Sequence, residues 1–247
     1  MEPYKFTRAK IDEHIVKIGV DIRPVLELKL DHERLYHVGK ELTNDYPELF
    51  ESLVQSPAEF RIMKKFLFTG SREAELVTLV TTPRGLVFIF PKLLSAIGEE
   101  IDFDNIADRA VECLQKIKRS FPHKKIIRVG IVNEYIFDTA DQDACKIICE
   151  RFTKFSANPA ELLLRINKQT DDYNRIIEMQ PLQKIQNMPE LSGRPQNVGY
   201  GLKVKVDFNN IDTIKELEKV KIYEIIHSGQ EYNEKELYDF LNSQTGD

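Results

Sequence analysis

The sequence contains no tryptophan, only three cysteines, and no apolar run long enough to cross a bilayer. Three cysteines are an odd number and too few for the disulfide framework of a small secreted domain. Residues 1–14 lack the apolar core of a secretory signal. Together these absences predict a protein of the reducing cytoplasm with no membrane partner.

The composition is that of an ordinary globular protein. The chain has 247 residues, of which 42% are hydrophobic and 30% charged, enough for a core that needs neither disulfides nor metals. The formal net charge of −5 gives the whole molecule no general attraction to nucleic acid or to an anionic membrane.

Two similar stretches organise the rest of the chain. Residues 126–131 read Ile-Ile-Arg-Val-Gly-Ile, and residues 15–20 read Ile-Val-Lys-Ile-Gly-Val. Both alternate and are rich in β-branched residues, which is typical of strands. A glycine inside a strand marks a bulge, or a close approach by another backbone or a ligand. We therefore expect two equivalent strands, each with a crowded or functional glycine.

Each of these strands is followed by a helix, three further strands and another helix. The predicted fold class is α+β: two tandem βαβββα units, residues 1–122 and 123–247, with mostly antiparallel sheets and helices packed on one face. One continuous globular domain is the alternative. We expect helices at residues 31–45, 102–120, 140–155, 212–220 and 233–242, and strands at residues 14–30, 59–69, 74–82, 86–90, 162–166, 173–180 and 202–208. Residues 74–82 and 86–90 should form a hairpin, and residues 48–55 a short turn.

Residues 181–201 carry six prolines and glycines and few apolar residues. A long stretch without a pattern inside a compact domain is functional, disordered or misread. We interpret it as a contact surface for another protein, with four apolar anchors: Leu182, Ile185, Met188 and Leu191.

A basic cluster covers the end of the helix at 102–120 and the strand that follows: Lys116, Lys118, Arg119, His123, Lys124, Lys125 and Arg128. Cations favour helix C-termini, which explains part of the cluster. The alternative hypothesis is a nucleic-acid or nucleotide site formed by Lys17, Lys124, Lys125 and Arg128. Phe121 is the one aromatic residue among the cations of the basic cluster, whereas single-strand binding requires several that interleave with the basic residues.

No catalytic or metal motif stands out. Cys145 and Cys149 share a helical face, but no histidine lies near them, and buried core packing is the favoured interpretation. The five histidines form no metal signature. We therefore expect no metal and no cofactor, and we favour a non-catalytic role. A hydrolase whose site is assembled only in space is the second alternative.

The strand Arg128-Val129-Gly130-Ile131 is similar to a mid-chain strand of an uncharacterised, sporadically distributed prokaryotic protein family of about this length. In that family the strand continues with Arg-Tyr and soon an Asn, whereas this chain has Val132-Asn133-Glu134-Tyr135. The resemblance brings no known activity. It implies an accessory role, such as a component of a mobile or defence-associated gene set.

The leading hypothesis from the sequence is a scaffold or binding protein that recognises another protein and self-associates. It depends on the missing catalytic motifs and on the strand edges that small sheets leave available for pairing.

Overall fold

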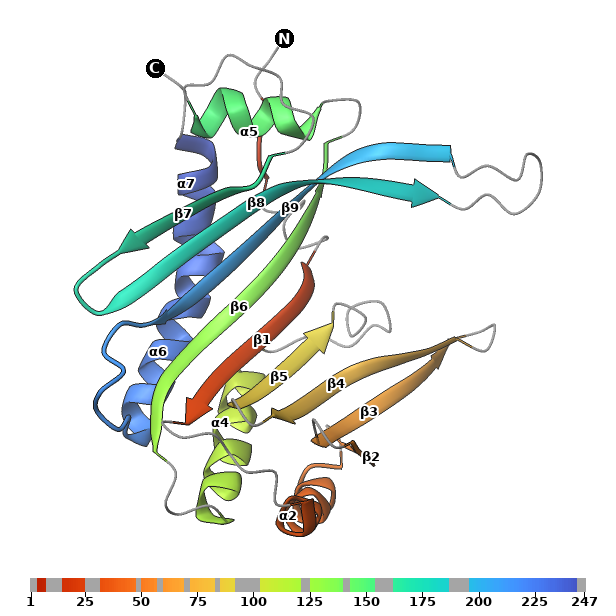
Figure 1. The fold of residues 1–247 in the computed structure, drawn as a ribbon, viewed down its shortest axis with the longest axis vertical. Helices are drawn as coiled ribbons and strands as arrows, with labels where there is room; N and C mark the ends of the chain where they lie inside the picture. The colour runs from red at the N-terminus through yellow and green to blue at the C-terminus, as the bar shows by residue number, and fades with distance from the viewer. Residues whose placement is uncertain are drawn as a thin grey trace.

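The computed structural model has an α+β fold with one antiparallel sheet (Figure 1), which confirms the predicted fold class. The strand order is β2-β3-β4-β5-β1-β6-β9-β8-β7. The strands are β1 (Ile15–Pro24), β2 (Ser52–Gln55), β3 (Phe60–Phe68), β4 (Arg72–Thr82), β5 (Gly85–Pro91), β6 (Ile126–Asp138), β7 (Leu164–Gln169), β8 (Tyr173–Gln186) and β9 (Gln196–Asn210). The structure describes residues 4–7, 15–24, 32–47, 50–56, 60–68, 72–82, 85–91, 103–120, 125–139, 143–153, 162–186 and 196–243.

The two similar stretches form the central strands β1 and β6, which pair antiparallel. Val20 stands opposite Ile131, the residue that holds the same place in the second stretch. The pairs on either side of it correspond to each other. Gly19 of β1 faces Val132 of β6, and Gly130 of β6 faces Asp21 of β1. The two equivalent strands therefore lie side by side at the centre of the sheet.

On each side of the β1–β6 pair, the next three strands follow in reverse chain order. Beyond β1 come β5, β4 and β3, and beyond β6 come β9, β8 and β7. The extra edge strand β2 replaces the turn predicted at residues 48–55, since Leu53 pairs with Ile62 of β3. One sheet crosses the predicted boundary between residues 122 and 123. The origin of the two halves by duplication stays a prediction.

Figure 1 shows the helices behind the sheet and at its end. They are α2 (His32–Asp45), α4 (Phe103–Ser120), α5 (Ala144–Phe152), α6 (Lys219–Glu231), the π-helical turn η1 (Tyr232–Glu236) and α7 (Leu237–Ser243). Helix α6 packs on β6, α4 packs between α6 and α2, and α5 packs on β8 and β9. None of the helices described is both long and apolar enough to cross a membrane.

Strand alternation places the core on the helix side of the sheet. In β6, Val129, Ile131 and Phe137 are buried, whereas Val132 and Ile136 are half-buried on the other face. In β9 the same alternation buries its even-numbered residues from Leu202 to Phe208.

Gly130 is a crowded glycine, as the sequence predicted. A Cβ at this position would lie 2.6 Å from the backbone oxygen of Phe208 and 2.8 Å from the Cβ of Asn209. The close neighbour is thus strand β9 of the same chain, which accounts for the glycine without a ligand.

Several predicted elements have correct types and nearly correct bounds. The hairpin of β4 and β5 is confirmed, with Thr82 paired to Gly85. The predicted loop at residues 181–201 is wrong at both ends, because β8 continues to Gln186 and β9 begins at Gln196. These extensions form a two-stranded ribbon that projects beyond the sheet (Figure 1).

Two helix predictions need correction. Helix α5 begins at Ala144 and is capped by Asp143, whose carboxylate accepts from the backbone N–H of Cys145; the sequence analysis began it earlier. The predicted helix at residues 212–220 is wrong, because the chain is irregular to Glu218 and α6 starts at Lys219.

Candidate protein-binding site

The predicted basic cluster is partly neutralised by acidic neighbours. Lys118 donates to the carboxylate of Glu216. This hydrogen bond, together with the positive charges of Lys118 and Lys125, lowers the pKa of Glu216. Lys116 pairs with Asp45, and Lys124 lies outside the described residues.

The structure separates the other two predicted cations. Lys17 of β1 pairs with Glu134 of β6, whereas Arg128 pairs with Arg23. Arg128 and Glu134 are six residues apart along β6. At about 3.3 Å per residue, these two places are roughly 20 Å apart. Lys17 and Arg128 therefore do not belong to one compact anion site.

Two of the four predicted apolar anchors lie in strand β8. Leu182 is half-buried in β8 and pairs with Gly201. Ile185 is also in β8 and pairs with Asn197. Met188 and Leu191 lie outside the described residues, so their role as anchors stays a prediction.

The strand edges carry features that oppose pairing with another sheet. Edge strand β2 has four residues, and edge strand β7 exposes Arg165 and Lys168. Pro181 follows the end of the β7–β8 ladder at Met179. Short strands, edge charges and prolines are the usual defences against edge-to-edge association, so a binding site is better sought elsewhere.

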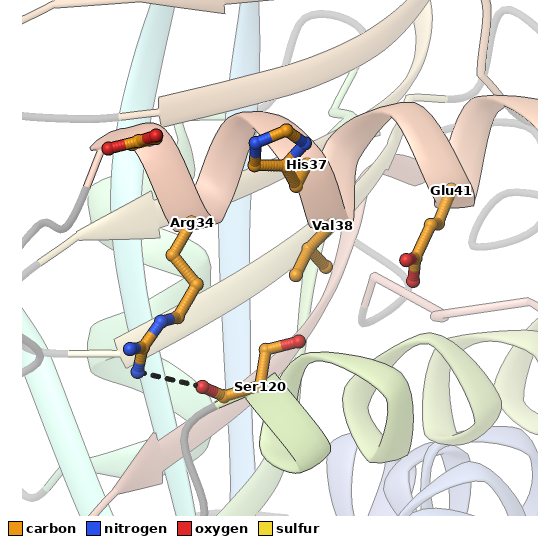
Figure 2. A pocket seen from close by; sticks show the side chains of 6 residues that line it. Arg34, His37, Val38, Glu41 and Ser120 are labelled. Carbon is orange, nitrogen blue, oxygen red and sulfur yellow. Dashed lines mark hydrogen bonds between the residues drawn. The ribbon is translucent and has the colours of Figure 1, made fainter.

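A cavity of about 290 Å³ lies between α2 and the end of α4 (Figure 2). Its lining is Glu33, Arg34, His37, Val38, Glu41 and Ser120. Arg34 donates from Nη1 to the backbone oxygen of Ser120 over 3.0 Å. Because a cation at a helix C-terminus satisfies a free carbonyl, we assign Arg34 a structural role in joining the two helices.

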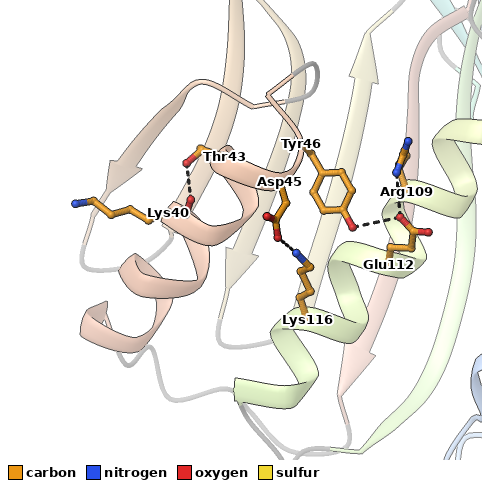
Figure 3. A network of polar contacts seen from close by, with 7 residues as sticks. All are labelled: Lys40, Thr43, Asp45, Tyr46, Arg109, Glu112 and Lys116. Atoms are coloured by element: carbon orange, nitrogen blue, oxygen red, sulfur yellow. Dashed lines mark hydrogen bonds and ion pairs between the residues drawn. The ribbon is translucent and has the colours of Figure 1, made fainter.

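A polar network joins the same helices further along (Figure 3). The Tyr46 hydroxyl donates to Glu112 over 3.2 Å, and Arg109 lies 3.3 Å from the same carboxylate. Burial and the nearby Cys113 and Glu112 raise the pKa of Tyr46 to about 12. All these groups have partners within the helix pair, so the network stabilises the fold.

A larger cavity, of about 520 Å³, opens at the start of α6. We call it the acidic pocket. Its lining combines the β7–β8 turn, the loop after β9 and the first turns of α6: Asp171, Asp172, Asn210, Asp212, Lys215, Glu216, Leu217, Glu218, Val220, Lys221 and Glu224. Six carboxylates and two ammonium groups give this lining a formal charge of −4.

Buried backbone contacts hold the walls of the acidic pocket. The side chain of Asn210 accepts from the Val129 N–H over 2.8 Å and donates to the Ile127 carbonyl over 2.9 Å. The Ile211 N–H donates to the Asp172 carbonyl, and the Leu217 N–H to a carbonyl of β6. Both walls are thereby fixed to the sheet.

Two exposed aliphatic side chains belong to this region: Val220 lines the pocket, and Ile214 lies in the loop between the lining residues Asp212 and Lys215. Ile214 is 90% exposed and Val220 is 67% exposed, the two highest values among the large hydrophobic residues of the described chain. Sequence reasoning missed them because a helix was predicted at residues 212–220. The Asp212 carboxylate instead accepts from the Ile214 N–H over 2.9 Å, which turns the chain locally.

The remaining candidates from the sequence fit a structural role. Cys113, Cys145 and Cys149 form no disulfide and are buried, as the core-packing interpretation predicted for the pair in α5. In the ranges that the structure describes, no three His, Cys, Asp or Glu side chains are grouped to hold a metal ion. No protein-family model matches the chain, and no curated protein matches it.

Proposed function

We propose that this chain is a non-catalytic binding protein that recognises another protein at the acidic pocket. The observation that carries the proposal is the exposure of Val220, which lines that cavity, and of Ile214, which lies in the loop between the lining residues Asp212 and Lys215. Moving a valine or isoleucine side chain from water into a contact is favourable by about 1.5–3 kcal/mol. Concave binding sites usually combine apolar side chains with a few polar groups.

The rigidity of the walls supports the same proposal. The loop that carries Ile214 is held at both ends, by Asn210 at its start and by the Leu217 N–H near its end. A site that is already ordered loses less conformational entropy when a partner binds. Self-association, expected from the sequence, is retained as part of the proposal.

A nucleic-acid function is less well supported. The acidic pocket has a formal charge of −4, which repels phosphates. On the basic side, Lys118 and Lys125 lie near the carboxylate of Glu216, which reduces the local positive potential.

The test compares two double variants. Ile214→Ser with Val220→Ser removes the exposed aliphatic pair, and Val54→Ser with Leu163→Ser removes two other exposed hydrophobics, 46% and 66% exposed. Each tagged protein is produced in the source cells, and its co-purifying proteins are quantified by mass spectrometry. Because all four sites are exposed, both variants should unfold within about 0.5 kcal/mol of the wild type.

We expect a partner that co-purifies with the wild type and with the Val54/Leu163 variant, but not with the Ile214/Val220 variant. Equal recovery of every co-purifying protein in all three samples would contradict the proposal.

A further inference from the structure

We infer that the partner reaches the acidic pocket with a cationic segment, in which lysine or arginine is followed closely by an aliphatic residue. The inference rests on the proposed function and adds the chemistry of the bound segment. It starts from two exposed aliphatic residues, Val220 in the first turn of α6 and Ile214 in the loop before it, and it is argued from the charge of the pocket lining.

The charge around this surface is not balanced from within. Lys221 pairs with Glu224 over 3.1 Å, and Lys118 from α4 pairs with Glu216. In the part of the chain described, Asp171, Asp172 and Glu218 have no ion pair and are exposed. Against these three carboxylates the lining offers one ammonium group outside the pairs above, that of Lys215. The carboxylates exceed the cations, and a cationic ligand would supply the missing charge.

The three carboxylates come from separate segments of the chain and meet in the lining of one cavity. Acidic residues near a helix N-terminus stabilise the helix, and this explains Glu218, which precedes α6. Asp171 and Asp172 belong to the turn between β7 and β8, where aspartate is a usual turn residue. The turn does not by itself require their carboxylates to line the same cavity as Glu218. The Asp172 carbonyl accepts from the Ile211 N–H over 3.0 Å, and this contact ties that turn to the loop that carries Ile214.

The size and the apolar component of the site favour a polypeptide. A cavity of about 520 Å³ falls within the usual range of about 300–1,000 Å³ for ligand sites. The exposed Ile214 and Val220 would contact the aliphatic residue of the segment and the methylene stem of its lysine or arginine. A hydrated metal ion would leave both side chains in water.

Synthetic peptides test this inference. One labelled peptide alternates lysine with serine and contains two leucines, and a second has glutamate in place of each lysine. Binding is measured by fluorescence anisotropy at low and at high salt. The test variant is Asp171→Asn, Asp172→Asn, Glu218→Gln. The control variant, Glu150→Gln, Glu231→Gln, Asp239→Asn, changes the net charge equally at exposed positions outside the pocket lining.

We expect the lysine peptide to bind the wild type and the control alike, to bind the test variant at least about tenfold more weakly, and to lose affinity with salt. The glutamate peptide should not bind. Equal affinity for the test and control variants, or for the two peptides, would overturn the inference. If the test variant still captures the cellular partner that the Ile214/Val220 variant loses, then the proposed function stands and the cationic segment is wrong.

Discussion

Tyr46 shows how one side chain joins two helices of the first half. It is 7% exposed, and its hydroxyl donates to Glu112 of α4. Burial, followed by the charges of Cys113 and Glu112, raises its pKa from 10.0 to about 12. The folded state therefore holds the phenolic proton more tightly than the unfolded state does. The stabilisation from this proton is complete below about pH 10 and is lost as the pH rises to about 12.

Tyr46→Phe should remove this dependence. We expect a loss of about 1 kcal/mol at neutral pH from the missing hydrogen bond, and a shallower fall in stability above pH 10 than in the wild type. Ultraviolet titration of tyrosinate should show one fewer late-ionising phenol. Tyr232 is another such group, whose pKa is also about 12 because it is buried. A titration curve that differs only by an ordinary, early-ionising phenol would show that Tyr46 is not shielded.

The sequence pattern predicted which residues are buried better than it predicted which hydrophobic residues are exposed. The crowding at Gly130 and the burial of Cys145 and Cys149 follow from residue type and alternation. The exposure of Ile214 could not be predicted, because it depends on a local hydrogen bond from its N–H to Asp212. A single aspartate can begin a helix or make a turn, and the sequence does not distinguish these outcomes.

Asn210 connects two elements and orders the acidic pocket. It is 5% exposed, and its side chain is bonded to the Val129 N–H, the Ile127 carbonyl and the Asp212 carbonyl. Strand β6, the end of β9 and the loop before α6 meet at this residue.

Asn210→Ala should destabilise the protein by about 2–3 kcal/mol, because the Val129 N–H is left buried without a partner. It should also weaken peptide binding at the acidic pocket, since the loop loses its anchor. Asn174→Ala is the matched control, as its side-chain amide donates to Asn209 from a half-buried position. Urea unfolding followed by circular dichroism gives both free energies. An equal loss of unfolding free energy in the two variants would contradict the proposed role of Asn210 as an anchor.

Elements with a strong local pattern were predicted well. The α4 helix and the β4–β5 hairpin have periodic apolar residues and turn signals of their own. The start of α6 was not predicted, because the Leu217 N–H donates to a carbonyl of β6, about ninety residues earlier in the chain. The ribbon of β8 and β9 was missed because proline and glycine concealed its strand character.

At the scale of the whole molecule, the α+β fold class was predicted, but the pairing of strands between the two halves was not. An α+β fold with helices on one face follows from the alternation and the order of elements. That β1 would pair with β6, and so join both halves in one sheet, depends on long-range contacts. The acidic pocket likewise unites Asp171 with Glu218, which no motif connects. The proposed site is therefore assembled only in three dimensions.

The most direct measurement is site-specific photo-cross-linking inside the source cells. A photoreactive residue replaces Val220, and in a parallel strain it replaces Val54, which is exposed on the distant edge strand β2. We expect a defined cross-linked protein from position 220 and none from position 54, with the attachment site next to lysine or arginine. Cross-links of equal yield from both positions, or none from position 220, would contradict a protein-binding role for the acidic pocket.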